Sequence, residues 1–436
     1  MIGAGIAGLA AAAAVRDSFD RVVLVERDHL PAAAVARRGV AQGDQLHNLL
    51  ARAQLHLEEL LPGFAQQLRE IGCGEGAVSA DTHVFELGIR MPERDLGLRI
   101  VSARRPAIDH AARTLLDPTI EIIDESRVVD LVHDATGVSG VIVERFDDTF
   151  TVDADLVVDA SGPAALAARW TTDSGMDLGV DEVHADQWYV SAEVASDGPP
   201  WSQHRFLLVF PTFPKTRGGL MSPAGDGTWH LSLSGKSDDA IPRSYAEMIH
   251  YAESLEDPVI SERIAISRCL GEPKVYRKGM ANWRRFDLLD RPIPGLMVVG
   301  DAFAGLNPLF GQGVSLLAWE ASILREILRS NGFADRAATT THYFAAAAQA
   351  VDAAWKLGEL VSSALVVEQD GRLIDLTSAL ASLVAEDADL HALYVRIWHL
   401  LEPAESLKNP IIRQRLSERA SLLREHAGAA EGTVLT

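Results

Sequence analysis

Three features of the 436-residue sequence predict an α/β fold with a Rossmann-type domain, an inserted β-sheet domain and a C-terminal helical region. A glycine-rich turn at residues 3–8 leads into an alanine-rich helix and then into the apolar run 21–26, which is typical of a buried parallel strand. Aromatic and alternating apolar residues become frequent between 171 and 275, which indicates a separate sheet. Beyond residue 330 the chain is rich in alanine and leucine, which favours helix.

The predicted domain boundaries follow these changes in composition. We expect the Rossmann-type domain to occupy residues 1–170 and 276–330, with a hairpin at 80–100 that leans on the inserted domain. The inserted domain covers 171–275, and the helical region covers 331–436. A chain of this length suits two or three domains.

Apolar spacing predicts the elements of the first part of the chain. The strand that should precede the glycine-rich turn is nearly missing, because only Met1 and Ile2 stand before Gly3 and a strand normally needs about five residues. We therefore expect a start codon placed too late, or a chain trimmed at this end. The other predicted elements are a helix over 45–70 that Pro62-Gly63 interrupts, a hairpin within 83–101, a helix over 108–116, a β-meander of 120–123, 128–132 and 138–144, and a buried strand at 155–159.

Composition limits the compartment and the partners. The formal net charge of −21 argues against nucleic acid and anionic membranes. Only two cysteines are present, Cys73 and Cys269, which excludes a disulfide framework and a thiolate zinc site, and we predict no metal. A single disulfide stays open, but two reduced thiols in a cytoplasmic protein fit better. The apolar start lacks the basic segment of a signal peptide, and no later run is long enough to span a membrane.

The first motif is Gly-x-Gly-x-x-Gly at Gly3, Gly5 and Gly8, with Glu26 at the end of the following strand. The first glycine makes the tight turn, the second lets a pyrophosphate approach the backbone, and the third lets helix and strand pack closely. The helix N-terminus attracts phosphate, and Glu26 can accept from ribose hydroxyls. This combination predicts a dinucleotide site, and the alternative is a packed, glycine-rich helix start.

A second motif favours FAD over NAD. The apolar strand 295–299 ends in Gly300-Asp301, and the loop 307–313 then opens a helix from Val314. Asp301 can accept from a polyol chain, although a helix cap is the alternative for this side chain. The second helix N-terminus would stabilise negative charge on a reduced flavin ring, and Pro308 stiffens the turn.

These motifs resemble the FAD-dependent monooxygenases of the para-hydroxybenzoate hydroxylase fold. Residues 37–42 with His47, and residues 57–63, look like the squalene-epoxidase-like branch, which includes bacterial polyether epoxidases. The segment 104–109 resembles the place where an arginine leads into a helix near the flavin chain, and Arg105 matches that arginine. The resemblance covers residues 1–330 and is weakest in the inserted domain.

The resemblance implies an extended FAD whose ring lies at the border with the inserted domain. Reduced flavin would react with O₂ to give a C4a-hydroperoxide, whose distal oxygen enters a hydrophobic or aromatic substrate in a bacterial biosynthetic pathway by hydroxylation or epoxidation. The predicted catalytic residues are His47, Pro308, Phe310 and Gly311. The predicted cofactor-binding residues are Gly3, Gly5, Ala7, Gly8, Glu26, Arg27, Arg37, Arg105, Val129, Asp301, Pro308, Gly311, Gly313 and Val314.

One departure from the family pattern concerns the electron source. Many single-component hydroxylases carry Ala-Asp-Gly where this chain has Ala160-Ser161-Gly162. The change puts direct reduction by NADPH in doubt, so NAD(P)H would act either directly or through a separate flavin reductase. The substrate, free or bound to a protein, cannot be identified from the sequence, and no histidine or carboxylate in 171–275 forms a pattern that names a general base.

Three other functions are weighed against oxygen insertion. Flavin-dependent halogenases use an early lysine and a Trp-x-Trp segment, but the first lysine here is Lys215 and no Trp-x-Trp occurs. Alkene reductases of the same fold carry a Pro-aromatic-Trp-Phe-Pro type segment, which 210–214 matches only superficially. A non-catalytic flavoprotein is the third alternative, and the intact 307–313 loop argues against it.

Several side chains have two interpretations. His47 either faces the flavin or is a core residue of an apolar helix, and Arg37 is favoured over Arg38 as the arginine that contacts FAD. A group of aromatic residues either lines a substrate pocket or forms the core of a sheet, and the core is favoured for most of them. The group comprises Trp188, Tyr189, Phe206, Phe210 and Trp229.

Overall fold

The computed structural model describes residues 1–40, 42–43, 45–196, 205–212, 215–225, 227–366 and 371–433. Phe213 and Pro214 of the segment compared with alkene reductases, and Ala41 of the segment 37–42, lie outside these residues. The chain forms two compact units: the first comprises 1–73, 103–185 and 278–356, and the second 74–102, 186–277 and 357–436. The units differ from the predicted domains because residues 74–102 and the C-terminal helices are grouped with 186–277.

A parallel sheet forms the centre of the first unit. Strand β1 (Val23–Val25) pairs with β7 (Glu121–Ile123), and β11 (Val157–Asp159) pairs with β18 (Leu296–Val298). Ile2 bridges the two pairs, because it lies parallel to Val25 on one side and Asp159 on the other. It thus takes the place of the short first strand. Assigning 120–123 to a meander was wrong, since a short, mostly apolar segment suits either kind of sheet.

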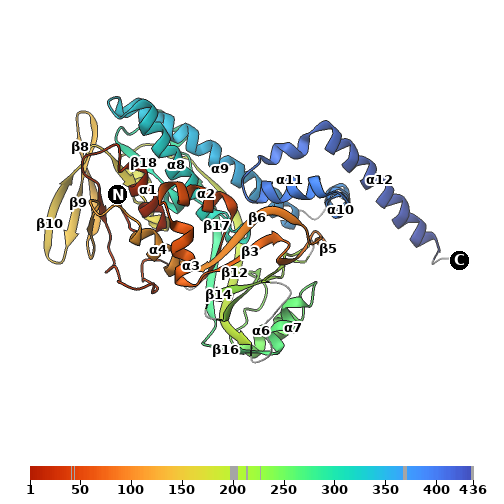
Figure 1. Ribbon diagram of the computed structural model, residues 1–436. Coiled ribbons are helices and arrows are strands. Elements are labelled where there is room, and N and C mark those ends of the chain that lie inside the picture. Colours follow the sequence, from red (N-terminus) through yellow and green to blue (C-terminus); the bar gives the residue numbers. More distant parts are fainter. Residues whose placement is uncertain are drawn as a thin grey trace. The chain divides into compact units, whose positions relative to one another are not determined.

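The meander itself consists of β8 (Arg127–Asp134), β9 (Gly137–Arg145) and β10 (Asp148–Asp153), joined antiparallel (Figure 1). The predicted strands at 128–132 and 138–144 are confirmed as β8 and β9. The third strand, β10, was missed because most of its residues are exposed and its sequence carries little apolar alternation.

Helices cover the parallel sheet of the first unit. Helix α1 (Ile6–Val15) packs on α8 (Gly313–Asn331), and so does α2 (Ala51–Leu60) (Figure 1). Eight of the ten residues of α1 are buried, which explains why this helix is apolar on every side. The other helices of this unit are α3 (Phe64–Ile71), α4 (Arg105–Thr114), α5 (Leu166–Asp173) and most of α9 (Arg336–Val366).

The predicted helix over 45–70 needs a correction. Residues Leu46–Leu49 form strand β2, and only then do α2 and α3 follow, separated by Gly63 with a left-handed φ of +92°. The leucines at 46, 49 and 50 have helical spacing, but β2 joins a three-stranded sheet of order β2-β6-β3. Pairing in this sheet overrides the local spacing. The partners are β6 (Asp95–Arg104) and β3 (Gly74–Ser79).

A large sheet has the strand order β19-β17-β12-β15-β14-β13-β4-β5, with β16 beside β12. The predicted hairpin is confirmed in β4 and β5, which pair antiparallel. The strands are β4 (Thr82–Glu86), β5 (Ile89–Arg90), β12 (Val180–Ser196), β13 (Phe206–Val209), β14 (Gly218–Gly225), β15 (Thr228–Lys236), β16 (Ser267–Cys269), β17 (Lys274–Arg284) and β19 (Ala304–Gly305).

One face of this sheet packs in the second unit against α6 (Tyr245–Ala252) and α7 (Val259–Ala265). Trp188 is a buried member of this core and Trp229 packs against it, as the core interpretation predicted. Tyr189, Phe206 and Phe210 are not part of it. Side chains alternate between the faces of a strand, so the aromatic group is divided between the two faces of the sheet.

The C-terminal helices of the second unit are α10 (Gly371–Glu386), α11 (Ala388–Trp398) and α12 (Pro410–Thr433). Arg94 ties the end of α10 to the 74–102 segment by donating to the carbonyl oxygens of Val384 at 2.9 Å and Ala385 at 2.5 Å. Buried residues of α10 and α11 also share a cluster with Met91, which explains why these helices belong to this unit. Among the described residues, none of the helices has the length and apolar character that crossing a membrane requires.

Candidate functional site

The glycine-rich turn has the geometry that its spacing predicts. Gly3 has a left-handed φ of +94°, which favours glycine, and a Cβ on Gly8 would lie 1.9 Å from the carbonyl oxygen of Gly3. A Cβ on Gly5 would meet only Arg105 Nη2, at 3.9 Å. The first and third glycines are thus required by the turn itself, whereas the second leaves open space beside the backbone.

The N-terminus of α1 offers free hydrogen-bond donors. Gly5 caps the helix without a side-chain hydrogen bond, and Ile6 N–H donates to Asp109 Oδ1 at 3.1 Å. The N–H groups of Gly5 and Ala7 have no acceptor among the residues that the structure describes. Unpaired donors at a helix N-terminus bind anions, so this turn fits the pyrophosphate of FAD.

A buried ion cluster supports the turn from below. Arg37 Nη1 lies 3.3 Å from Glu26 Oε2, and Arg37 Nη2 donates to Asp109 Oδ2 at 3.2 Å and to the Ala4 carbonyl at 3.0 Å. Arg105 Nε donates to Asp109 Oδ1 at 3.1 Å. The side chains of Arg37, Glu26 and Asp109 are at most 8% exposed. Two guanidinium groups and two carboxylates therefore balance in charge beneath the glycines.

Glu26, the predicted ribose ligand, is already bonded within the protein. Its Oε2 accepts from Ala4 N–H at 2.7 Å and its Oε1 from Asp28 N–H at 3.0 Å. A carboxylate has about four acceptor positions, so capacity for a ribose hydroxyl remains. The ribose role of Glu26 stays a prediction.

Arg37 is bonded within the protein and Arg38 is exposed, and a contact of either arginine with FAD stays a prediction. Arg27 is also mostly exposed, and its Nη2 donates to the Gly39 carbonyl at 3.4 Å. A pocket lies beside the turn, and its lining includes Asp109 and Arg113, which sequence reasoning did not predict there. Asp109 was detectable only as the i+4 partner of Arg105 on one helix. The lining includes Pro31, Val40, Arg37, Arg105, Asp109 and Arg113.

The second motif forms a tight turn after β18. Gly300 has a φ of +65°, and a Cβ there would lie 3.0 Å from Ala7 Cβ, so this turn reaches the start of α1. Gly300 N–H donates to Glu320 Oε2 at 2.6 Å, and burial raises the pKa of Glu320 well above its usual range. Glu320, a residue of α8 that the sequence did not single out, thus anchors the turn.

Asp301 follows in this turn and is half-buried. Its carboxylate has no hydrogen-bond or ion-pair partner among the described residues, so it is free to accept from a polyol chain. Arg284 Nη1 fixes the backbone here by donating to the carbonyl oxygens of Asp301 at 3.0 Å and Ala302 at 3.2 Å. Arg284 was missed because nothing in its local sequence indicates this contact.

The loop 307–313 leads into a second free helix N-terminus. The Asn307 side chain accepts from Leu309 N–H at 3.1 Å, and Gly311 has a φ of +65°. The N–H groups of Gly313 and Val314 have no acceptor within the described part of the chain, and a Cβ on Gly313 would meet no atom within 4 Å. These donors suit negative charge on the pyrimidine side of a reduced flavin. Pro308 begins the loop's short 3₁₀ turn, Pro308–Phe310, in which Phe310 is buried.

His47 lies on strand β2 and not on a helix, which corrects the expected setting of this residue. Its Nδ1 is 3.1 Å from the Gln45 carbonyl and its Nε2 is 3.3 Å from Gln42 Oε1. The loop 307–313, here called the flavin loop, is close to the same strand, because a Cβ on Gly311 would lie 3.9 Å from the Asn48 carbonyl oxygen. Val129 lies at a bulge of β8, where the register with β9 shifts. The roles of His47 and Val129 stay predictions.

Ser161 has a structural task of its own. Its Oγ accepts from Leu166 N–H at 3.1 Å at the start of α5. Asp159 accepts from the N–H groups of Ser161 at 2.9 Å and Ala167 at 2.7 Å, and burial raises the pKa of Asp159. An aspartate at 161 could cap the helix equally well, so capping alone does not explain the serine.

A polar row crosses the large sheet within the second unit. Glu193 on β12 and Ser222 on β14 are both cross-strand partners of His230 on β15. Val190, Ala192 and Val194 belong to the apolar core, so the alternating Glu193 points to the opposite face. His230 is 4% exposed and Ser222 is fully buried. Sequence reasoning missed this row because its three members lie on three different strands.

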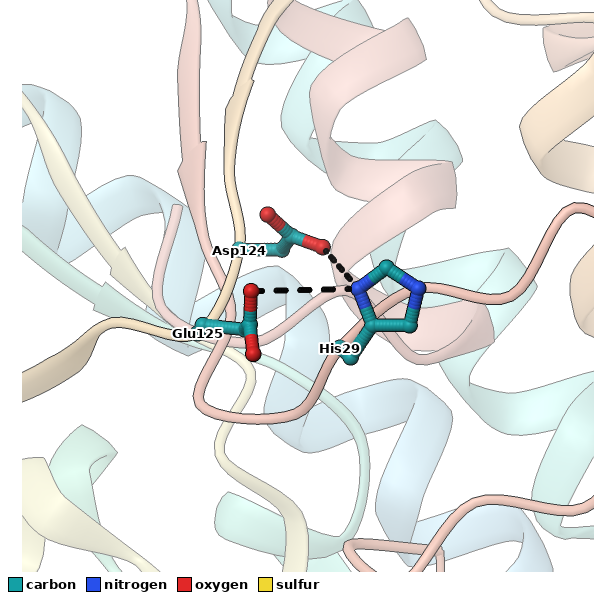
Figure 2. A group of neighbouring side chains, drawn as sticks. All are labelled: His29, Asp124 and Glu125. Atoms are coloured by element: carbon teal, nitrogen blue, oxygen red, sulfur yellow. Dashed lines mark ion pairs between the residues drawn. The ribbon is translucent and has the colours of Figure 1, made fainter.

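Figure 2 shows a separate cluster at the ends of β1 and β7, where Asp124 and Glu125 point toward His29. His29 Nδ1 lies 3.2 Å from Asp124 Oδ2 and 3.9 Å from Glu125 Oε2. Asp124 Oδ2 also accepts from Leu30 N–H at 3.0 Å, and His29 is 71% exposed. We assign the cluster to surface ion pairing, which contributes little to stability.

The chain is similar to known proteins in sequence and in structure. Residues 1–183 match the family described as FAD dependent oxidoreductase. Protein Rv3254 of Mycobacterium tuberculosis is 28% identical over 77% of this chain and 73% of its own length. Menaquinone reductase of Mycolicibacterium smegmatis is 26% identical over 77% of each chain.

Solved structures share the fold. The flavin-dependent brominase Bmp2 superposes with a TM-score of 0.71 at 18% identity, covering 96% of this chain and 97% of its own. The p-nitrophenol 4-monooxygenase PnpA of Pseudomonas putida has a TM-score of 0.64 at 15% identity, covering 92% of this chain and 97% of its own. The chain thus shares the mixed α/β fold of these flavoprotein structures, and its first 183 residues match the FAD dependent oxidoreductase family.

Proposed function

We propose that the protein is an FAD-dependent monooxygenase that inserts one oxygen atom from O₂ into a hydrophobic or aromatic substrate. The main support is the second helix N-terminus, where the unpaired N–H groups of Gly313 and Val314 suit a reduced, anionic flavin. FAD supplies the redox chemistry and the activation of O₂. The protein binds the cofactor through the 3–8 turn, Asp301 and the 307–313 loop.

The reaction needs two electrons and two protons, because one oxygen atom enters the substrate and the other leaves as water. We propose NAD(P)H as the source, either directly or through a separate flavin reductase. Ser161 in place of the family's aspartate favours the second route. The variant Ser161→Asp keeps the cap on Leu166 N–H and tests this point alone.

We propose a proton-handling role for the polar row Ser222–His230–Glu193 of the second unit. His230 is the residue of this row most suited to move a proton from a phenol. Hydroxylation would use such a base, whereas epoxidation needs none.

Reduction of a quinone is the second candidate. The 26% identity to a menaquinone reductase over 77% of the chain supports it. A reductase of this kind would pass the two flavin electrons to the substrate and consume no O₂. Both candidates need the same cofactor site, so they differ only in where the electrons go.

Oxygen consumption separates the two. FAD-loaded protein is supplied with NADPH, with and without a general flavin reductase, and with either a phenol or a quinone as substrate. Monooxygenation predicts O₂ uptake equal to the hydroxylated product formed, and ¹⁸O₂ label in that product. Anaerobic turnover of the quinone would instead establish the reductase, and brominated product in bromide buffer would establish a halogenase. Faster bleaching by NADPH alone in Ser161→Asp than in the wild type would show that Ser161 limits direct reduction.

A further inference from the structure

One face of β17 is directed at the Gly300–Gly305 segment of the first unit. Arg284 donates to the backbone of this segment and to Asn282 Oδ1 at 3.2 Å. A Cβ on Gly305 would lie 3.1 Å from Asn282 Oδ1 and 3.1 Å from Lys278 Nζ. Lys278, Asn282 and Arg284 are separated by even numbers of residues, as required for one face of a strand. The Lys278 ammonium therefore reaches a point two residues before the flavin loop.

Lys278 differs from its neighbours in having nothing to bind. Arg284 donates to the Asn282 side chain and to the Ala302 carbonyl oxygen. Lys278 Nζ, by contrast, has no hydrogen-bond acceptor and no ion-pair partner among the residues described. The residue is half-buried, whereas Lys274, four residues earlier on the same strand, is exposed. An ammonium that loses water without gaining a partner is unfavourable.

The electrostatic surroundings also leave the Lys278 ammonium without a compensating partner. Burial lowers the pKa of Lys278, nearby Asp301 raises it, and the positive charge of Arg284 lowers it further. No ion pair joins Lys278 to Asp301 among the described residues. Lys278 is only half-buried, so an acceptor group of a bound molecule can reach its ammonium.

We propose that Lys278 binds the substrate by donating a charge-assisted hydrogen bond to an oxygen attached to its ring. The inference rests on the proposed function and narrows its substrate class to an apolar ring with one oxygen that carries or accepts negative charge. A phenolate and a quinone carbonyl share this chemistry. An ammonium favours the ionised phenol, which is the form that reacts with an electrophilic oxygen.

The test measures ligand binding to oxidised, FAD-loaded, full-length protein without turnover. 4-Nitrophenol is the first probe because its phenolate absorbs visible light, and 1,4-naphthoquinone is the second. Nitrobenzene is the matched ligand that lacks the phenolic oxygen. The variants are Lys278→Met, Lys278→Arg as the conservative replacement, and Lys274→Met as the control on the same strand. FAD content and melting temperature show that each variant is folded.

We expect Lys278→Met to weaken binding of 4-nitrophenol or naphthoquinone by about tenfold or more and to abolish the phenolate signal at a pH where the free phenol is protonated. Lys278→Arg should retain part of the binding, Lys274→Met should match the wild type, and nitrobenzene affinity should change by no more than about twofold. The probe that loses affinity shows whether the oxygen belongs to a phenol or a quinone.

Two results would overturn the proposal. Equal affinity of Lys278→Met and Lys274→Met for both probes would make Lys278 a solvated side chain. A change in the flavin spectrum or reduction potential of Lys278→Met without ligand, with probe affinity intact, would show that the lysine serves the cofactor. The binding test requires neither O₂ nor a reductant, so it is independent of the proposed monooxygenase reaction. If binding depends on Lys278 but the enzyme consumes no O₂, the monooxygenase function is refuted and the role of Lys278 stands.

Discussion

Arg37→Met is the change that best tests how the nucleotide turn is supported. Arg37 is the only cation that touches both Glu26, at 3.3 Å, and Asp109, at 3.2 Å, in the described ion pairs, and it also donates to the Ala4 carbonyl. Methionine fills a similar volume without charge. The variant therefore leaves two buried carboxylates with one remaining guanidinium, that of Arg105, which contacts only Asp109.

The expected cost is large because the cluster is almost fully buried. Removing one partner of a buried ion pair destabilises a protein by about 3–5 kcal/mol, since the other charge is left without compensation. For a unit of this size, about 2–4 °C of melting temperature is lost per kcal/mol, so the midpoint should fall by on the order of 10 °C. Arg37→Lys keeps the charge but not the fork of donors, and should lose less.

Thermal unfolding at pH 7.5, with and without saturating FAD, measures this effect. Arg38→Met is the control, because Arg38 is the adjacent residue and is exposed. A melting temperature equal to that of Arg38→Met would refute the cluster's role in stability. A deficit seen only with FAD would mean that Arg37 acts on the cofactor and not on the fold.

Three further variants test other parts of the structure. Gly8→Ala places a Cβ 1.9 Å from the Gly3 carbonyl oxygen and should lose FAD binding, whereas Gly271→Ala meets no atom within 4 Å and should match the wild type in FAD titration. Burial raises the pKa of Glu86 from 4.5 to about 7, although Tyr394 donates to it at 2.6 Å. The unfolded chain therefore releases this proton at a lower pH than the folded state does. Because of this difference, the stability of the folded state falls as pH rises from 4.5 to about 7. Glu86→Gln should therefore be more stable than the wild type at pH 8, by about 1–3 kcal/mol in denaturant titrations, and equal to it near pH 4.5; the reverse order would contradict the assigned pKa. Glu320→Gln keeps an acceptor for Gly300 N–H and removes a costly buried charge, so it should melt higher at pH 8 with FAD retained; loss of FAD would show that the charge itself is needed.

Local sequence was sufficient wherever a motif fixes its own backbone. The glycines of the 3–8 turn and the loop 307–313 were predicted because positive φ values and close approaches leave little choice of residue. The helices α1 and α8 and the strands β1, β11 and β18 follow directly from these turns. The predictions were wrong at residues 46–49, where the leucine spacing suits either helix or strand, and at 120–123, where a short, mostly apolar segment suits either of two sheets.

The sequence by itself thus determined the fold class and the position of the dinucleotide turn, because both depend on spacing within a few residues. The structure changed the understanding of the side chains around that turn. Asp109 reaches Ile6 across 103 positions, and Glu320 and Arg284 approach Gly300 and Asp301 from separate elements. Only tertiary packing decides such contacts, since no local pattern records which distant charge meets which backbone group. Lys278 is the clearest case, because nothing in its local sequence distinguishes it from other strand lysines. Its functional role could be proposed only after the structure placed its ammonium beside Gly305 without a partner among the described residues.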